Sequence, residues 1–450
     1  MTRSQHFRNF LIIALIGAVS LYWYLSTPDK ARLELSQMQG KIPKLDTMRP
    51  EKYPTIKIAK IIGWAQGAAP TPAKGLSVTP FAADLNHPRW LHVLPNGDVL
   101  VAESTQPSRP TDGVGDWITR TIMTRANGAK VSANRITLLR DADGDGVAEF
   151  RSILLEGLNS PLGMALYGES LLVANTDEVR AFPFKVGDTK ITAKGQKMMS
   201  LPANAPNNHW TRNIIIDPKG EKLFVTIGSN SNIAENGAEA EKDRAQIKQY
   251  DLKTGQTRIW AYGIRNPTGL AFNPISGSLW MTVNERDMLG SDGPPDYLST
   301  ADFGTFYGWP YYYWGGMEDR RVTQSRRDLR QYSKRPDYAL GPHVAALGLA
   351  FSPGKTWGDS FANGAFVAMH GSWNRVPVSG YKVVYIPYNE RGFPQDEAKP
   401  IDVLTGFLNK GGEAQGRPAG LAFDKSGGLL VADDSGNRIW RVTPAKETAP

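Results

Sequence analysis

Residues 267–282 read Pro-Thr-Gly-Leu-Ala-Phe-Asn-Pro-Ile-Ser-Gly-Ser-Leu-Trp-Met-Thr, which is an apolar run, a polar turn and a second apolar run. Short apolar runs bounded by Asn-Pro and Gly predict two β-strands joined by a turn. The same pattern starts at five other positions, namely 88, 161, 211, 346 and 418. The chain therefore repeats, and the repeated unit begins with a pair of strands.

Six such units, widely spaced and with no helical pattern between them, predict an all-β fold, a six-bladed β-propeller. The last unit ends near Val442 and leaves room for about three strands. We expect Leu76–Ala82 to supply the missing outer strand and close the ring, because closure removes exposed sheet edges. The predicted propeller domain spans residues 76–450, and the 45 Gly and 31 Pro of the chain suit its many turns.

The N-terminus predicts a membrane anchor followed by a linker. Arg3 and Arg8 precede the uncharged apolar run Phe10–Leu25, and no small-residue cleavage site follows it. We expect residues 1–25 to form a signal anchor or transmembrane segment that places the rest on the periplasmic side of the bacterial inner membrane. If the run is cleaved instead, the chain is secreted to the periplasm. Residues 26–75, which several prolines interrupt, are predicted to be a linker.

Composition excludes several classes of protein. The chain has 450 residues and no cysteine, so it holds neither disulfides nor a covalently attached c-type haem. Its formal charge of +8 comes from basic residues that are scattered rather than clustered with aromatics. We therefore expect a solvated basic surface and no nucleic-acid partner.

Charged and polar side chains precede the repeated first strands. His209, Arg265, Asn266, Arg89 and Arg417 all occupy this position, where loops of a propeller converge on the mouth of its channel. Several arginines and a histidine at one mouth favour a planar anionic ligand with several carboxylates. The alternative for any one of these residues is a hydrogen bond between blades.

Four segments make the pattern specific. A resemblance to the quinoprotein glucose/sorbosone dehydrogenase family is found in Ile264-Arg265-Asn266-Pro267-Thr268-Gly269-Leu270, Asn284-Glu285-Arg286-Asp287, Phe306-Tyr307-Gly308-Trp309-Pro310 and His370-Gly371-Ser372-Trp373-Asn374-Arg375. The resemblance covers about residues 76–442. It implies a six-bladed propeller that uses pyrroloquinoline quinone (PQQ) and Ca²⁺ to oxidise an aldose or a related sugar.

The resemblance also implies residue roles. His209 matches the general base that takes the hydroxyl proton as hydride leaves carbon, and Arg265 matches the catalytic residue that bonds the quinone oxygens. His370 and Arg375 lie where the glucose enzymes have a lysine–arginine pair. The residues expected to bind the cofactor are Arg89, Arg265, Asn266, His370, Arg375 and Arg417.

For calcium, the resemblance points to a pair of backbone carbonyls after the second strand of a unit. The matching positions are Asp287 and Met288, in place of the family's Gly-Pro, and the Asp287 carboxylate suits a hard cation. Two other segments have structural interpretations. Asp141–Gly146 resembles an EF-hand loop but lacks Glu at its twelfth position, so we expect a turn between strands; Pro294–Tyr297 predicts a rigid loop.

Three functions compete. The first is a sugar dehydrogenase that passes electrons to a separate acceptor, a quinone or a cytochrome, because the chain cannot hold its own c-type haem. The second is a metal-dependent lactonase or other hydrolase, which would need acidic side chains around a central cation. The third is a non-catalytic binding propeller, which has no need for a His and an Arg-Asn pair at the starts of neighbouring strands.

Overall fold

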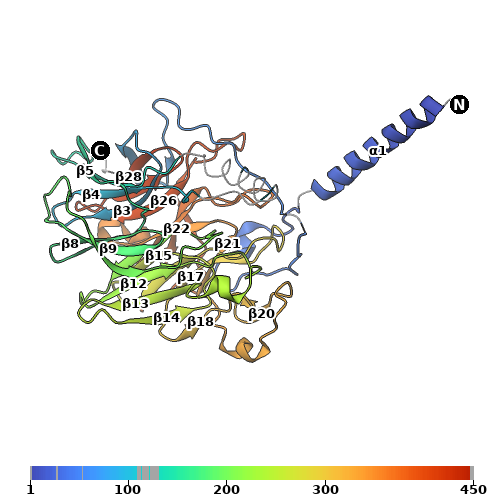
Figure 1. The fold of residues 1–450 in the computed structure, drawn as a ribbon. Helices are drawn as coiled ribbons and strands as arrows, with labels where there is room; N and C mark the ends of the chain where they lie inside the picture. The colour runs from blue at the N-terminus through green and yellow to red at the C-terminus, as the bar shows by residue number, and fades with distance from the viewer. Residues whose placement is uncertain are drawn as a thin grey trace.

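The computed structural model describes residues 3–26, 29–52, 54–108, 113, 121 and 131–445. Six sheets stand around one axis and form the predicted six-bladed propeller (Figure 1). Within each sheet the first strand is innermost, and first strands of successive blades contact one another around the ring, from β3 through β7, β11, β15, β22 and β26 back to β3. The residues before each first strand therefore meet at one end of the axis.

The first three blades have the following strands. Blade 1 contains β3 (Pro88–Val93), β4 (Val99–Glu103), β5 (Arg135–Arg140) and β6 (Phe150–Leu155). Blade 2 contains β7 (Met164–Tyr167), β8 (Ser170–Ala174), β9 (Glu178–Pro183) and β10 (Gln196–Ser200). Blade 3 contains β11 (Ile214–Ile216), β12 (Lys222–Ile227), β13 (Gln246–Asp251), β14 (Thr257–Tyr262) and a parallel edge strand, β18 (Thr305–Phe306).

The other three blades complete the ring. Blade 4 contains β15 (Pro267–Phe272), β16 (Leu279–Val283), β17 (Pro295–Thr300) and β21 (Tyr338–Pro342). Blade 5 contains β22 (Ala346–Phe351), β23 (Gly364–Met369), β24 (Lys382–Pro387), β25 (Ile401–Thr405) and β1 (Thr71–Pro72). Blade 6 contains β26 (Pro418–Phe423), β27 (Leu429–Asp433), β28 (Arg438–Pro444) and β2 (Leu76–Ala82).

Shorter elements lie outside the blades. The hairpin β19 (Tyr312–Tyr313) and β20 (Met317–Glu318) stands between β18 and β21. The 3₁₀ helices are η1 (Leu35–Met38), η2 (Ala238–Glu241), η3 (Arg327–Tyr332), η4 (Lys355–Trp357) and η5 (Asp359–Phe361).

Closure of the ring is confirmed as predicted. β2 pairs antiparallel with β28, so the last blade takes its outer strand from the segment that precedes the first blade. One expectation was wrong: Pro294–Tyr297 is not a loop throughout, because Pro295 begins β17. Proline is tolerated as the first residue of a strand, where its missing N–H breaks no ladder.

Glycines in the repeated Gly-Leu-Ala pattern let the inner strands pack closely. A Cβ added at Gly269 would lie 2.4 Å from the Leu347 carbonyl oxygen, and one at Gly348 would lie 2.4 Å from the Ala419 carbonyl oxygen. Each of these oxygens belongs to the next blade, so any side chain would push neighbouring blades apart. Packing of the ring thus requires the glycine that repeats in the sequence. Apolar cores fill the spaces between blades, and one of them contains Trp280, Leu298 and Val367.

The N-terminal helix α1 (Arg3–Ser26) stands apart from the propeller (Figure 1). Among its described side chains, Phe10, Ile13 and Leu15 are exposed. Within the described residues no helix is long and apolar enough to cross a membrane, so the predicted membrane anchor is not supported.

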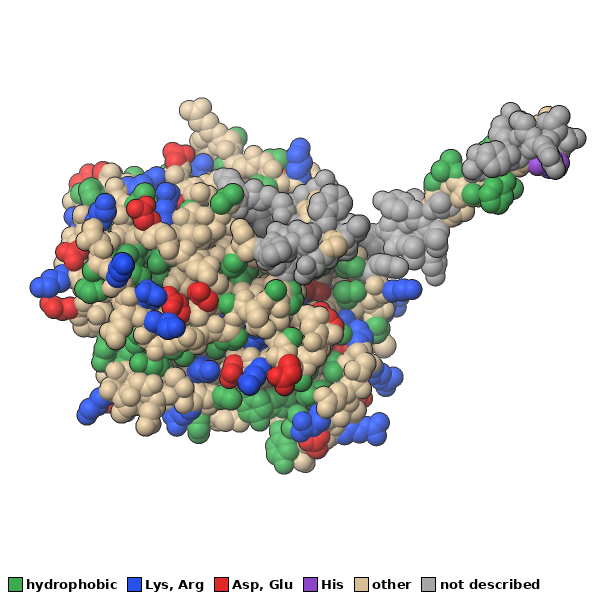
Figure 2. Space-filling view, in the orientation of Figure 1, with side chains coloured by type: hydrophobic (Ala, Val, Ile, Leu, Met, Phe, Trp, Pro, Cys, Tyr) green, Lys and Arg blue, Asp and Glu red, His purple; other side chains and the backbone are tan. Residues whose placement is uncertain are grey.

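The visible surface carries charges of both signs. Lys and Arg side chains are interspersed with Asp and Glu over the face drawn in Figure 2. On the face drawn, the basic side chains do not gather into one patch.

Candidate active site

The predicted site residues gather where the first strands begin, around a cavity on the propeller axis. The cavity is small and is lined by Arg89, Trp90, Leu162, Thr211, Thr268 and Leu347. These residues come from five blades, which is possible only near the axis. The lining is also close, along the chain, to predicted site residues on three blades. Arg89 is one of them, Thr211 follows His209 by two residues, and Thr268 follows Asn266 by two residues.

His209 enters from the loop before β11, and its ring has a fixed tautomer. The Nδ1 atom lies 2.9 Å from the Ser229 carbonyl oxygen and 2.9 Å from Ser229 Oγ. A carbonyl oxygen only accepts, and Ser229 Oγ donates its own proton to the Ser231 carbonyl, so Nδ1 must carry the hydrogen. Burial lowers the pKa of His209 well below its usual value, and Arg265 lowers it further. His209 is therefore neutral, with its lone pair on Nε2.

Asn266 lies close to His209 because the residue between them is glycine. A Cβ at Gly228 would lie 2.5 Å from His209 Cβ and 2.6 Å from Asn266 Oδ1. Asn266 Oδ1 is buried, and it has no hydrogen-bond partner among the described residues. A buried polar atom without a partner is costly and calls for an explanation, and a ligand donor is one.

Arg265 is placed as predicted but already uses its donors. Its Nε and Nη2 bond to the Asn232 carbonyl and side chain at 3.2 and 2.8 Å, and its Nη1 bonds to the Asn284 and Glu285 carbonyls at 3.3 and 2.6 Å. The remaining N–H, on Nη2, donates to Asp287 Oδ2 at 2.9 Å. All five donors of the guanidinium are thus occupied within the protein, which differs from the expected contact with quinone oxygens.

Asp287 is the centre of a charged group that sequence reasoning only partly found. Its Oδ1 accepts from Asn374 Nδ2 at 2.8 Å and lies 3.7 Å from His343 Nδ1. Burial alone would raise the pKa of Asp287, but Arg265 and His343 outweigh it and hold this pKa below its usual value. Burial would lower the pKa of His343, but Asp287 outweighs that and raises it.

His343 and Asn232 were missed, yet one signal was available. His87, His209 and His343 precede first strands by one, five and three residues, so a histidine recurs near this position of the repeat. Asn232 gives no such signal, because it arrives from the long loop between β12 and β13.

A second group of predicted residues surrounds Asp434, which follows β27. Asp434 Oδ2 accepts from Arg89 Nη1 at 2.5 Å and from His370 Nε2 at 2.7 Å. Burial lowers the pKa of His370 to about 3, and Arg417 contributes to this shift, so a neutral His370 donates its Nε2–H while Arg89 balances the charge. Arg417 donates to the carbonyls of His370 and Gly371 at 3.0 and 2.7 Å. Arg89 Nε is buried without a partner among the described residues.

Arg375 does not join either group. It is buried, and it donates from Nε to the Ser291 carbonyl at 2.9 Å and from Nη1 to the Pro377 carbonyl at 2.7 Å. These bonds brace the loop after β16 against the loop after β23, so the visible role of Arg375 is to position loops.

The two carbonyls expected to ligate calcium are engaged by an arginine. Arg321 Nη1 donates to the Asp287 carbonyl at 2.8 Å and to the Met288 carbonyl at 2.9 Å. The main-chain N–H of Glu51 donates to the same Met288 oxygen at 3.1 Å. As arranged, these residues do not fit a cation ligated by both carbonyls.

The segment predicted to be a linker is bound to the propeller at several points. The Arg32 N–H donates to the Asp292 carboxylate at 2.9 Å, and Arg49 joins the same carboxylate at 2.8 Å. Further along, the Lys57 N–H bonds to the Trp373 carbonyl at 2.8 Å and Trp64 Nε1 donates to Asp433 at 2.6 Å. The segment thus crosses the loops of blades 4, 5 and 6 on the same face as the site.

One acidic cluster lies elsewhere. Asp141, Asp143, Asp145 and Glu149 have carboxylate oxygens within 4.8 Å of one another, and in the described part of the chain they are the group found with the spacing of a metal site. They form the turn between β5 and β6, at the opposite end of the blade from the mouth. The hydrolase alternative needs acidic ligands around a central cation, and this cluster does not supply them on the axis.

Comparison with known proteins gives one family and several relatives. The family model described as TrAA12-like matches residues 70–295 and 317–445. An uncharacterised protein of Borreliella burgdorferi is 30% identical over 302 residues, which are 63% of this chain and 76% of that protein. A pyrroloquinoline quinone-dependent pyranose dehydrogenase of Coprinopsis cinerea is 23% identical over 72% of this chain, and the match spans 51% of that enzyme's length.

A solved structure supports the fold. The iodide structure of the Trichoderma reesei Carbohydrate-Active Enzymes Family AA12 protein superposes with a TM-score of 0.68 at 19% identity. The superposition covers 84% of this chain and 98% of that chain.

Proposed function

The chain belongs to the TrAA12-like family, and from this premise we propose that it is a PQQ-dependent sugar dehydrogenase, an oxidoreductase. The observation that carries the proposal is His209, a neutral histidine of fixed tautomer two residues before Thr211, which lines the axial cavity. A non-catalytic propeller has no use for an oriented base, and the hydrolase alternative needs acidic side chains around a central cation rather than a mouth lined with arginines. The substrate class, a sugar, rests on the similarity to the pyranose dehydrogenase of Coprinopsis cinerea.

His209 acts as the base. Its Nδ1–H is held by Ser229, so Nε2 presents a lone pair that takes the proton of the sugar hydroxyl as hydride leaves the same carbon. Because Nδ1 donates to a carbonyl, the imidazolium formed in the step gains a stronger hydrogen bond there, which stabilises it. The bound quinone supplies the chemistry that accepts the hydride.

The residues of the mouth fit such a cofactor in charge and in unsatisfied hydrogen bonds. Arg89 and Arg417 offer positive charge to carboxylates, and Asn266 Oδ1 and Arg89 Nε are buried polar atoms that lack partners among the described residues. Arg265 acts in this site through its fixed positive charge near His209 and through the loops it ties together, since its donors are in use. His370 orients Arg89 by sharing Asp434 with it.

Calcium is the finer part of the expectation, and the residues predicted for it do not fit it. The carbonyls of Asp287 and Met288 are occupied by Arg321, so no step of the reaction is assigned to a metal. Electrons leave to a separate acceptor, a quinone or a cytochrome, because a chain without cysteine cannot carry a covalently attached c-type haem.

The place of action in this proposal is the periplasm. The support is the order of Arg3, Arg8 and the apolar run Phe10–Leu25, which is typical of an export signal. Cell fractionation of the full chain tests it: recovery with the cytoplasmic marker would contradict the proposal. The share of the chain found in the membrane fraction and in the periplasm would show whether α1 stays in the protein or is cleaved off.

The experiment that tests the function is reconstitution of the purified chain with PQQ. We expect the quinone absorbance to shift on binding and to change again when an aldose is added. His209→Gln is expected to bind the quinone with unaltered affinity and to slow sugar oxidation by about 10²–10⁴-fold, the usual contribution of a positioned base. His92→Gln replaces a half-buried histidine on β3, whose pKa is lowered to about 4 by desolvation, and is the matched control. Absence of any sugar-dependent change in the parent, or equal rates in parent and His209→Gln, would refute the assignment.

A further inference from the structure

The main-chain carbonyl oxygens of Asp287 and Met288 have no lone pair left for a metal. A carbonyl oxygen accepts two hydrogen bonds. The Asp287 carbonyl accepts from Arg321 Nη1 at 2.8 Å and from Asn232 Nδ2 at 3.1 Å. The Met288 carbonyl accepts from Arg321 Nη1 at 2.9 Å and from the Glu51 N–H at 3.1 Å. A cation binding here would first have to displace a guanidinium.

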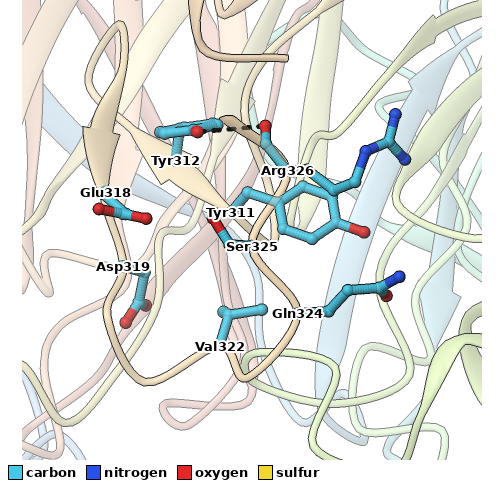
Figure 3. Close-up of a pocket in the computed structure, with 8 residues that line it drawn as sticks. All are labelled: Tyr311, Tyr312, Glu318, Asp319, Val322, Gln324, Ser325 and Arg326. Carbon is cyan, nitrogen blue, oxygen red and sulfur yellow. Dashed lines mark hydrogen bonds between the residues drawn. The ribbon is translucent and has the colours of Figure 1, made fainter. Parts of the chain in front are cut away.

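That guanidinium is firmly anchored. Arg321 donates from Nε and Nη2 to the two carboxylate oxygens of Asp319 at 2.9 and 2.7 Å, a bidentate pair of the strongest kind. The Asp319 side chain is wholly buried, and Arg286 Nη1 lies 3.6 Å from it. Asp319 stands with Glu318 on one side of a pocket of about 170 Å³ beside β20 (Figure 3). The chain directly after the β19–β20 hairpin therefore supplies Asp319, the residue that holds Arg321 in place.

The negative charge of the Asp287 side chain is also already balanced by residues of the protein. The Asp287 carboxylate is paired with Arg265 at 2.9 Å and faces His343 at 3.7 Å. A divalent cation bound to these carbonyls would lie among the positive charges of Arg321 and Arg265, and like charges at such short distances repel strongly in a buried site. Both the hydrogen bonds and the charges thus disfavour a metal at the turn.

We propose that Arg321 takes the place that the family resemblance gives to calcium. Its guanidinium supplies a fixed positive charge to the 287–288 turn, and the site binds its anionic quinone without a metal. Four of its five N–H groups hold the turn and Asp319, and among the described residues the fifth, on Nη2, has no bonded acceptor. The quinone part of this inference rests on the proposed function, whereas exclusion of a metal from the turn does not.

The test uses the full chain with the acidic turn disabled by Asp143→Asn and Asp145→Asn, so that calcium at that turn does not confuse the result. Thermal unfolding and PQQ affinity are measured in EGTA and in millimolar Ca²⁺. In this background we expect Ca²⁺ to leave the melting temperature unchanged and the PQQ Kd to agree within about twofold between the two conditions. A melting temperature raised by Ca²⁺, or a Kd that weakens more than tenfold in EGTA, would overturn the proposal.

The Arg321→Ala variant supplies the positive arm. Loss of the guanidinium frees two carbonyls and leaves Asp319 beside them, so Ca²⁺ should now raise the melting temperature. PQQ affinity should fall by roughly 10- to 150-fold in EGTA, the range expected for one charge-assisted hydrogen bond, and recover in Ca²⁺. No response to Ca²⁺ in this variant would count against equivalence of guanidinium and metal.

Two controls keep the result interpretable. Arg140→Ala removes a similar bidentate pair, with Asp98 in blade 1, and should lower stability without altering PQQ affinity. Arg321→Lys retains the charge if Arg321→Ala fails to fold, and it should stay insensitive to Ca²⁺. If PQQ binds none of these proteins, the proposed function fails, while the melting data still decide whether the turn excludes a metal.

Discussion

At the scale of single residues, the chemistry of His209 depends on what surrounds its ring. Its position before β11 follows from the repeat and could be predicted from sequence. Its tautomer could not, because Ser229 reaches Nδ1 from the loop after the second strand of the same blade. The same holds for Arg265: the sequence places it at the mouth, but only the structure shows that Asn232 and Asp287 occupy its donors.

The first prediction concerns pH. Burial, with Arg265 adding to it, lowers the pKa of His209 well below its usual 6.5. The base therefore stays unprotonated as the pH falls from 8 to 6, and kcat/KM for the sugar should remain flat across this range. Replacement of Arg265 by Gln removes a nearby positive charge, so it should move the acid limb of the profile to higher pH. A parent profile that already declines with a midpoint near 6.5 would contradict this account.

The same pKa shift affects stability. The unfolded chain takes up a proton at His209 near pH 6.5, whereas the folded chain takes it up only at lower pH. His209 therefore lowers the free energy of unfolding as the pH falls below about 6.5. His209→Gln should lose this part of the acid sensitivity, as measured by denaturant unfolding at pH 5 and pH 7.

The second prediction tests the close approach of His209 and Asn266. Gly228→Ala places a methyl group 2.5 Å from His209 Cβ, which the backbone holds in place. Overpacking of this kind costs about 1–3 kcal/mol, and displacement of the base should lower turnover at least about tenfold. Gly411→Ala, at an exposed glycine whose added Cβ would meet nothing nearer than 3.3 Å, should change neither stability nor turnover. Parental turnover in Gly228→Ala would show that the placement of His209 tolerates movement.

At the scale of elements, the strands were largely predictable and the segments between them were not. In each blade the Gly-Leu-Ala pattern or a variant of it marks the first two strands, because close packing of the inner strands requires it. The start of β17 was predicted to be a loop, because Pro294-Pro295 is typical of loops. The attachment of residues 29–64 to the propeller could not be read from the sequence, because it depends on side-chain and main-chain bonds to distant loops. The bond of the Arg32 N–H with Asp292 is one example. No sequence periodicity reports such bonds.

The third prediction concerns that segment. Asp292 accepts from the Arg32 N–H at 2.9 Å and from Arg49 Nη2 at 2.8 Å, and its side chain is 3% exposed. Asp292→Asn should cost about 1–3 kcal/mol at this point and speed hydrogen exchange in residues 29–52. Asp396→Asn breaks a pair with Lys41 in the same segment, but Asp396 is 89% exposed, so its effect should stay within about 1 kcal/mol. Equal exchange in the two variants would indicate that main-chain contacts alone hold the segment.

At the scale of the whole molecule, the ring is closed by one strand from the start of the domain. Its six blades and their closure could be read from the sequence because the repeat has a fixed unit and its last copy is short of a strand. β2 pairs with β28 from Leu76 to Ala82, so the two ends of the propeller domain stabilise each other. Without β2, β28 would become a long exposed edge, which invites pairing with other chains.

The last prediction removes this closure and leaves the rest of the ring intact. A chain that starts at Lys74 keeps β2 but loses the bonds of residues 29–64 to the mouth, so it should unfold cooperatively at a lower melting temperature than the full chain. A chain that starts at Asp84 lacks β2 and exposes β28, along with Val442, which is buried in the full chain. It should aggregate or melt without a cooperative transition, as followed by calorimetry and light scattering. Because both chains lack the same N-terminal contacts, the difference between them reports β2 alone. Similar melting of the two would mean that pairing of the inner strands suffices to hold the ring and that closure contributes little to its stability.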